Sequence, residues 1–342
     1  MPPGIQTTDR GARVSATFFL HVGLQRCAST LIEHAFLDPQ HHVSQQLRQA
    51  GVEPLLDLHL YLRDHRADAF WTDAFVADLR ANHMPPANGN VGGYFLTEEG
   101  LSATWLESGP GIDVAGRAHC LAALLVGFDA RILMLVRDQA SFVRSLYALH
   151  LQNGGQLGFA EFVKGIPQSA LDWHSLVGYF VDAFGAGAVQ VVPYNAECFQ
   201  AQTSPYPGFV SALQGLMGVA EPTEVPRNHL YNPSIKTPFL PMQLSANRTV
   251  PSEIAGAVSD LLRSGVTEPV AIMRDIRGRW GREAAAELRQ AFNTGMVAQA
   301  ANDAAGFDDT AATAFLARYA DSNRAMFAAF MPDYDPAPFL AA

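Results

Sequence analysis

The chain has 342 residues, of which 49% are hydrophobic and 16% charged, a composition typical of a folded globular protein. Its length allows one large α/β domain or two smaller ones, with a sizeable core in either case. The net charge of −10 disfavours nucleic acid or an anionic membrane surface as the main partner. An anionic ligand therefore has to be bound by locally placed arginines rather than by the overall field.

The N-terminal residues 1–16 are polar and lack an apolar signal core, so we expect them to form a disordered leader. Apolar runs such as Ile132–Val136 are far too short to cross a bilayer. The 3 cysteines (Cys27, Cys120 and Cys198) are widely spaced and include no C-x-x-C pair, which is typical of free thiols in a reduced compartment. We therefore expect a cytoplasmic protein.

The first predicted element is a buried parallel strand over the apolar residues 18–22. A short loop follows with Gly23, the cation Arg26 and the adjacent hydroxyls of Ser29 and Thr30, and then a helical pattern that ends near Asp38. The first N–H groups of a helix lack internal partners and attract anions, while arginine and hydroxyl groups donate to phosphate oxygens. The sequence therefore predicts a phosphate-binding loop at this junction.

Residues 55–83 form a helical pattern that is rich in histidine and aromatic residues, among them His59, His65, Phe70 and Trp71. One interpretation is a lid that binds a second substrate above the loop. The other, which we favour, is an amphipathic helix pair with core aromatics and solvated histidines, because such stripes more often pack than bind.

A short strand over residues 92–97 ends in two adjacent carboxylates, Glu98 and Glu99. Catalytic groups gather at the carboxyl ends of the strands in parallel sheets, so these acids lie where chemistry is expected. The alternative is that one of them caps the following turn. Since neighbouring side chains do not easily face the same pocket, we expect only one of the two to be functional.

The next apolar strand, residues 131–136, runs into Arg137 and then into a helix that carries Ser145. An arginine at a strand end offers a planar fork of donors that suits a phosphate, and the serine adds another donor. The alternative is that Arg137 pairs with a neighbouring acid at the sheet edge. The residues alone do not decide between these interpretations.

Two further helical patterns cover residues 253–263 and 283–300. The segment between them is basic and contains Arg274, Arg277, Arg279 and Arg282. It could face an anionic ligand, but a solvated face is the favoured interpretation, because clustered surface arginines commonly serve solubility.

Taken together, these motifs resemble those of the sulfotransferases. The loop from Gly23 to Thr30 is similar to their 5′-phosphosulfate loop, G-x-P-[KR]-[ST]-G-[ST]-[ST], with Gln25 and Ala28 where proline and glycine are usual. It departs from a Walker A sequence, which needs a lysine after its second glycine. Arg137 and Ser145 resemble the 3′-phosphate motif, an R-[DN]-P turn with a serine eight residues after the arginine, although Gln139 replaces the proline. Weaker matches at 189–194, 227–236 and 315–330 extend the resemblance over most of residues 17–330.

The resemblance implies a three-layer α/β fold, in which helices flank a central, mainly parallel sheet of the P-loop-NTPase-like type and additional helices follow at the C-terminus. Residues 17–342 would form a single domain, with a helical lid insert at about 41–85 and a helical C-terminal part at about 236–330. The implied donor is 3′-phosphoadenosine 5′-phosphosulfate (PAPS), the product is 3′,5′-ADP, and no metal is required.

The resemblance also implies roles for individual residues. Arg26 would stabilise the departing 5′-phosphate, and Arg137 and Ser145 would hold the 3′-phosphate. The other implied nucleotide contacts are Gly23, Gln25, Cys27, Ala28, Ser29, Thr30 and, as an extra phosphate contact, Lys236. Glu98 is the expected general base, followed by Glu99 and then His21. Leu31 stands where some members stack a tryptophan on adenine. The acceptor would be a hydroxyl or amine of a small metabolite or saccharide.

Two other functions stay open on the sequence. A P-loop kinase or nucleotide hydrolase would use the same strand, loop and helix, although the Walker lysine is missing and no magnesium-binding aspartate is evident after a strand. A catalytically inactive homologue would keep the nucleotide and lose turnover through Gln25 and Ala28. The sequence leaves the oligomeric state and the acceptor open.

Overall fold

The computed structural model describes residues 15–64, 72–87, 91–102, 114–199, 208–220, 234–293 and 295–340. Its centre is a 5-stranded sheet with the order β2-β3-β1-β4-β5 and parallel pairing throughout. The strands are β1 (Thr17–His21), β2 (Val52–Pro54), β3 (Gly93–Thr97), β4 (Asp129–Val136) and β5 (Val189–Pro193). The predicted fold class, a parallel α/β sheet flanked by helices with further helices at the C-terminus, is confirmed.

The register of the sheet brings the predicted motifs to one edge. His21 at the end of β1 pairs in register with Thr97 at the end of β3 and with Leu133 of β4. The loop after β1, the two glutamates after β3 and Arg137 after β4 therefore start from neighbouring strands at the carboxyl edge. β1 lies between β3 and β4 in the sheet. Parallel strands are joined by crossover connections, so strands that are neighbours in the sheet need not be neighbours in the sequence.

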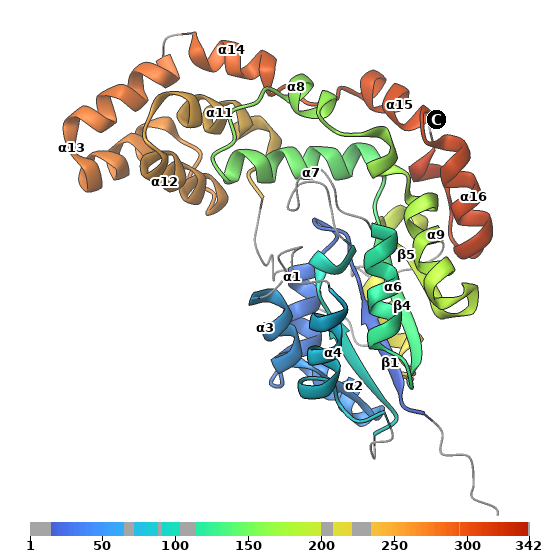
Figure 1. Cartoon of the computed structure of the whole chain (residues 1–342). Helices are drawn as coiled ribbons and strands as arrows, with labels where there is room; N and C mark the ends of the chain where they lie inside the picture. Colours follow the sequence, from blue (N-terminus) through green and yellow to red (C-terminus); the bar gives the residue numbers. More distant parts are fainter. Residues whose placement is uncertain are drawn as a thin grey trace, which may run out of the picture.

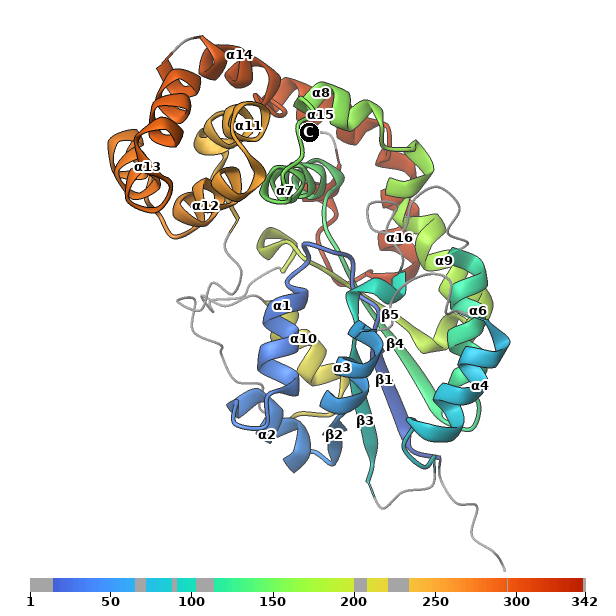
Figure 2. The same ribbon diagram turned by 60° about the vertical axis from the view of Figure 1, so that its left-hand side comes forward.

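Helices cover both faces of the sheet, so most residues of its strands are buried. The helices α1 (Ser29–Ile32), α2 (His42–Gln49) and α10 (Gly208–Leu216) lie on one side, and α4 (Asp73–Asn82), α6 (Val114–Leu124) and α9 (Trp173–Phe184) on the other (Figure 2). A π-helix, Glu33–Leu37, continues α1, and α3 (Leu56–Asp64) contacts β3. Fully buried aromatics join the layers: the rings of Phe36 and Phe95 lie 5.2 Å apart between centroids.

The remaining helices form a layer beyond the carboxyl edge of the sheet (Figure 1). They are α7 (Gln139–Gln152), α8 (Phe159–Lys164), α11 (Leu240–Thr249), α12 (Ser252–Arg263), α13 (Pro269–Asn293), α14 (Met296–Asp303), α15 (Asp309–Ala317) and α16 (Ala320–Phe330). Single 3₁₀ turns lie at Glu99–Ser102, Gln168–Leu171, Ala186–Ala188, Ala196–Cys198, Thr237–Phe239 (η7) and Ala337–Phe339. α7 crosses above the sheet, with α11 packed on it and α16 packed on α9.

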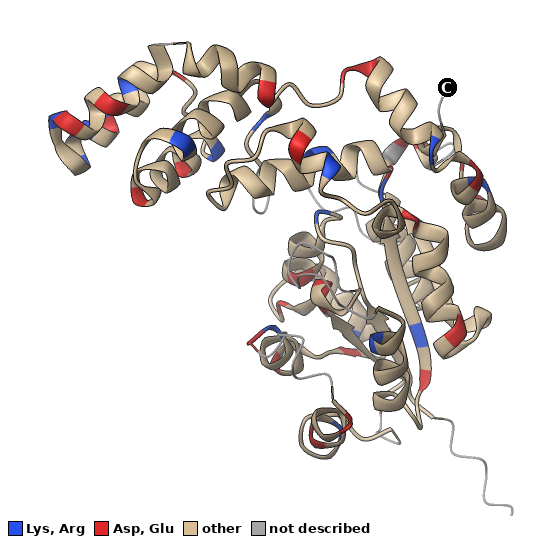
Figure 3. Cartoon of the chain, turned by 45° about the horizontal axis from the view of Figure 1, so that its top comes forward, with Lys and Arg blue, Asp and Glu red and all other residues tan. Residues whose placement is uncertain are grey.

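The structure adds detail to three sequence expectations. The segment 41–85 contributes an edge strand, β2, which the helical interpretation did not include. His59 on α3 is 3% exposed, so the expectation of a solvated histidine is wrong at this residue. The basic segment spans a break in α13 at Gly281 (φ 93°), so Arg274, Arg277 and Arg279 lie in the first helical part and Arg282 begins the second. The four arginines are exposed among acidic side chains, as the solvated interpretation predicted (Figure 3).

Some expectations fall on residues that the structure does not describe. They concern most of the leader (1–14), the residues His65, Phe70 and Trp71, and the first part of the 227–236 match. Among the helices that are described, none is long and apolar enough to cross a membrane.

Candidate active site

The loop after β1 turns sharply through two residues with left-handed backbone conformation. Arg26 has φ 63° and Ala28 has φ 62°, and both carry a Cβ that this region disfavours. Ala28 directly precedes the first residue of α1, at the position where the resemblance expects glycine. The predicted strand and helix on either side are confirmed. The loop therefore keeps a glycine-type turn without the glycine.

Residue 23 has to be glycine because the imidazole ring of His21 leaves no room for a side chain there. A Cβ on Gly23 would lie 2.5 Å from Cε1 of His21, closer than real carbon atoms approach. His21 is completely buried, its Nδ1 lies 2.8 Å from Oγ1 of Thr97, and burial lowers its pKa to about 3. The imidazole is therefore neutral and packs against Gly23 of the loop. Because His21 is completely buried, a substrate cannot reach it.

The two glutamates after β3 have different surroundings. The Ser29 hydroxyl donates a hydrogen bond to the Glu99 carboxylate, which places Glu99 at the start of α1. Glu98 is only 1% exposed, and its Oε1 accepts a hydrogen bond of 3.2 Å from the Gly100 amide. The two adjacent side chains therefore face different surroundings, as the sequence predicted. Glu99 contacts the loop after β1, whereas Glu98 is buried.

A buried histidine, His59, contacts the backbone and the carboxylate where the chain leaves β3. His59 Nδ1 donates to the carbonyl oxygen of Thr97 at 2.8 Å and lies 3.4 Å from Oε2 of Glu98. From the other side, Arg117 on α6 donates to the carbonyl oxygen of Gly100. These contacts fix the backbone on both sides of Glu99. Sequence reasoning missed His59 and Arg117, because neither belongs to a local motif with the glutamates.

The two arginines of the predicted phosphate motifs lie in direct contact. Arg137 Nη1 donates to the carbonyl oxygen of Arg26 at 3.2 Å. Arg26 Nε donates to Oγ of Ser145 at 3.0 Å, and its Nη2 donates to the Ser234 hydroxyl. Among the described residues, neither arginine forms an ion pair with a carboxylate. The alternative that Arg137 pairs with an acid at the sheet edge therefore finds no support in the described part of the chain.

Like charges gather around Arg26. Burial lowers the pKa of its guanidinium, and the positive charges of Arg137 and Arg263 lower it further, while Glu99 and Tyr194 act in the opposite direction. Arg137 also lies over the ring of Tyr194, 5.5 Å from its centroid. Arg263 ends α12 in the C-terminal layer, and no pattern in the sequence connects it with the loop. An anion placed among these cations would relieve their repulsion.

The start of α7, which follows Arg137 and leads to Ser145, is held by polar contacts. Asp138 caps the helix by accepting a hydrogen bond of 2.8 Å from the Ser141 amide. Gln139, which replaces the usual proline, exchanges two amide hydrogen bonds of 2.9 and 3.0 Å with Asn323 on α16. The terminal helix therefore fixes the direction in which α7 leaves the sheet, and with it the place of Ser145.

The other predicted site residues lie around this centre. Gln25 and Cys27 are buried, and burial raises the pKa of the Cys27 thiol to about 12, so the thiol stays protonated. Thr30 is half-buried, and Lys236 is exposed just before η7 and close in sequence to Ser234. Leu31 packs against the core. Among the described residues, no group of histidine, cysteine and acidic side chains has the arrangement of a metal site.

The chain was compared with known families and proteins. No known protein family and no curated protein matches it. Among solved structures it is similar to a sulfotransferase from Alicyclobacillus acidocaldarius, with a TM-score of 0.38 and 16% sequence identity, over 69% of this chain and 91% of that chain. A likeness this distant carries no weight for the site, so the function has to be argued from the residues themselves.

Proposed function

We propose that the protein is a sulfotransferase that moves a sulfuryl group from PAPS to a hydroxyl or amine. The observation that carries the proposal is the contact between Arg26 and Arg137, two cations without a carboxylate partner among the described residues, beside Ser29 and Ser145. A ligand with anionic groups at two separate points would neutralise both arginines. PAPS has this character, with a 5′-phosphosulfate and a 3′-phosphate on one adenosine.

In this proposal the two phosphorylated ends of the nucleotide bind to residues that follow two different strands, β1 and β4. Arg26, Ser29, Thr30 and the backbone of Gly23–Ala28 hold the 5′-phosphosulfate at the end of β1. Arg137 and Ser145 hold the 3′-phosphate at the end of β4, with Lys236 as an additional cation. The hydrogen bonds from Arg26 to Ser145 and Ser234 then give way to bonds with the nucleotide, because a charged acceptor binds a guanidinium more strongly than a hydroxyl does.

The reaction is an in-line displacement at sulfur. The acceptor oxygen or nitrogen forms a bond to sulfur while the bond from sulfur to the 5′-phosphate oxygen breaks, and 3′,5′-ADP leaves with the electron pair. Arg26 stabilises the charge that develops on the departing phosphate. A carboxylate takes the proton of the acceptor. No metal is required for any of these steps.

The geometry favours Glu99 as that carboxylate. The sequence expectation named Glu98 first, but a general base must reach the acceptor, and Glu98 is 1% exposed beneath the turn. Glu99 accepts a hydrogen bond from Ser29 in the loop that would hold the sulfuryl donor. Its charge also raises the pKa of Arg26, so the two groups are near neighbours. We therefore propose Glu99 as the base and Glu98 as the residue that holds the turn.

One contact also favours a second candidate, a nucleotide kinase or hydrolase. A hydroxyl at the start of the loop helix paired with a carboxylate is an arrangement that P-loop enzymes use to hold Mg²⁺. Here Ser29 and Glu99 form such a pair. The chain nevertheless has an arginine in a left-handed turn instead of the Walker lysine. An inactive protein that still binds 3′,5′-ADP is the third candidate.

Thermal unfolding with added nucleotides distinguishes these candidates, because a ligand that binds the folded state raises the midpoint. We expect 3′,5′-ADP to stabilise the protein without metal, and Mg·ATP to have little effect. Stabilisation by Mg·ATP alone would refute the sulfotransferase proposal. Release of 3′,5′-ADP from PAPS across a panel of small alcohols, phenols, amines and saccharides then separates an active enzyme from a protein that only binds. We propose that the acceptor is of this small-molecule or saccharide class and that the enzyme is cytoplasmic.

A further inference from the structure

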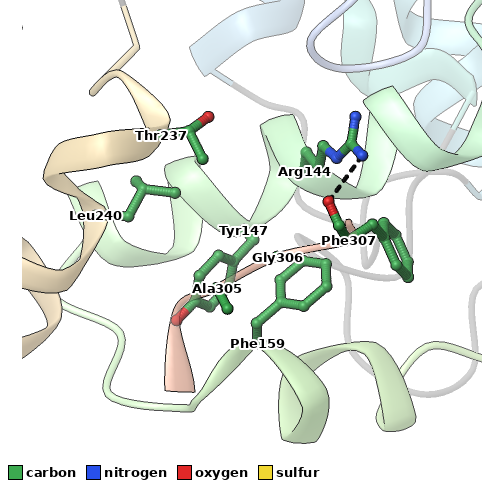
Figure 4. Close-up of a pocket in the computed structure, with 8 residues that line it drawn as sticks. All are labelled: Arg144, Tyr147, Phe159, Thr237, Leu240, Ala305, Gly306 and Phe307. Atoms are coloured by element: carbon green, nitrogen blue, oxygen red, sulfur yellow. Dashed lines mark hydrogen bonds between the residues drawn. The ribbon is translucent and has the colours of Figure 1, made fainter. Parts of the chain in front are cut away.

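A cavity lies beside α7, in the C-terminal layer (Figure 4). Its volume is about 190 Å³. Arg144 and Tyr147 of α7 form one wall, and the other lining residues are Phe159, Thr237, Leu240, Ala305, Gly306 and Phe307 (Figure 4). Ser145, which contacts Arg26, is absent from the lining. One helical step of about 100° separates neighbouring residues, so α7 presents different faces to the cavity and to the candidate active site.

The cavity has aromatic walls with defined geometry. The ring of Phe159 lies 5.1 Å from the ring of Tyr147 and 4.8 Å from the ring of Phe307, both in edge-to-face contact. The Tyr147 hydroxyl is engaged, since it donates to the carbonyl oxygen of Leu157 at 3.2 Å. Leu240 lines the cavity on the side away from Phe307 (Figure 4). An apolar cavity of about 150 Å³ is large enough for benzene, so this one has room for a single ring with a small substituent.

A cation, the guanidinium of Arg144, lies at the edge of the cavity. Arg144 Nη2 donates to the carbonyl oxygen of Phe307 at 2.9 Å, and its guanidinium lies 5.9 Å from the centroid of the Phe307 ring. Among the described residues, no carboxylate lies within ion-pair distance of Arg144. The acids on either side of the lining residues 305–307 have other partners. Asp303 forms an ion pair with Arg248 at 2.6 Å, and Asp308 caps α15.

We propose that this cavity binds a small cyclic carboxylate. The ring lies among Tyr147, Phe159 and Leu240, and the carboxylate pairs with the guanidinium N–H groups of Arg144 that the Phe307 carbonyl leaves available. Arginine suits this task because its planar donors match the two oxygens of a carboxylate. The inference stands on the cavity alone and holds whether or not the proposed sulfuryl transfer is correct.

Benzoate is the probe, and benzamide is its neutral control of the same shape. Saturation-transfer NMR detects contact between the ring protons and the full-length protein, and titration gives the dissociation constants. We expect benzoate to bind the wild type at least about tenfold more tightly than benzamide, as the loss of a charged hydrogen bond implies. Equal affinities, or no transfer to benzoate, would overturn the proposal.

Two variants locate the binding site. Arg144→Gln should weaken benzoate binding by about tenfold or more and leave benzamide unchanged. Leu240→Phe should weaken both ligands, because the larger ring fills the cavity. Arg274→Gln, on the exposed side of α13, is the matched control and should bind benzoate as the wild type does. Unchanged benzoate affinity in both Arg144→Gln and Leu240→Phe would place the ligand elsewhere and contradict the proposal.

Discussion

Arg137 donates a hydrogen bond of 3.2 Å to the backbone carbonyl oxygen of Arg26, so two cations that are far apart in the sequence meet at one edge of the sheet. The contact joins the loop after β1 to the end of β4, and Ser145 adds a second link through its bond with Arg26 Nε. Because like charges repel, this arrangement costs free energy in the absence of an anion. That cost is the physical reason to assign an anionic ligand to this edge.

The left-handed conformation of Ala28 predicts that glycine is the better residue there. Ala28→Gly should raise the free energy of unfolding by about 0.5–1 kcal/mol, because the penalty on the Cβ exceeds the added freedom of the unfolded chain. Ala286→Gly, on an exposed helical residue of α13, is the control and should lower it by about 1 kcal/mol. Urea denaturation measures both. A loss of stability in Ala28→Gly would mean that the strain is absent.

Gly23→Ala should destabilise the protein by about 1–3 kcal/mol, because the new methyl group overlaps the His21 ring. Removing the ring should remove most of this effect, so the substitution should cost clearly less in a His21→Ala background. Gly256→Ala on α12, where a Cβ meets no atom within 4 Å, is the matched control and should be neutral or stabilising. Equal costs in both backgrounds would show that His21 is not the cause.

The buried His21 predicts a pH dependence of stability. Burial lowers its pKa from 6.5 to about 3, so below pH 6.5 the unfolded chain binds a proton at this residue that the folded chain does not. The free energy of unfolding should therefore fall as the pH drops from 6.5 towards 3, by up to about 1.4 kcal/mol per pH unit. The stability difference between wild type and His21→Asn, measured at pH 7 and pH 5, isolates this effect. It should shrink by about 2 kcal/mol, whereas a constant difference would contradict the assignment.

The two glutamates should respond differently to the same change. Glu99→Gln should lower kcat for sulfuryl transfer by about 10²–10⁴-fold, as expected for a lost general base. It should lower the free energy of unfolding by less than about 1 kcal/mol, because the amide oxygen can still accept the hydrogen bond from Ser29. Glu98→Gln should instead destabilise the protein by about 1–3 kcal/mol, because it weakens the buried contact with His59. Steady-state kinetics and denaturation of both variants decide the matter. A stable Glu98→Gln protein without transfer activity, beside an active Glu99→Gln protein, would reverse the assignment.

The sequence predicted those parts of the fold that depend on local pattern. The strands around residues 18–22 and 132–136 are mainly apolar runs, and such runs are typical of a sheet covered on both faces. β2 was missed, because three residues that include Pro54 have no periodicity to detect. The exposed arginines of α13 were predicted as a solvated face, although most of the segment is helical up to the break at Gly281.

The candidate site was predicted in its motifs and missed in its long-range contacts. Arg26, Arg137 and Ser145 lie together, as motifs with fixed spacing at strand ends led us to expect. Their binding of phosphate, with Ser29, stays a prediction. The contribution of Arg263 depends on where the C-terminal layer packs, which no local pattern encodes. Ser234 lies in the 227–236 segment of the resemblance, but its contact with Arg26 was not predicted. The distinction between Glu98 and Glu99 likewise depends on His59, on a helix that precedes them.

The most direct test of the central claim is the affinity of 3′,5′-ADP and of 5′-AMP for the wild type and three variants, measured by titration calorimetry. Arg137→Gln should weaken 3′,5′-ADP by roughly 10–100-fold, as expected for a lost charged contact, and leave 5′-AMP nearly unchanged. Arg26→Gln should weaken both nucleotides, and Arg274→Gln neither. Equal effects of Arg137→Gln on the two nucleotides, or none on either, would contradict the claim that Arg26 and Arg137 hold the two ends of one nucleotide.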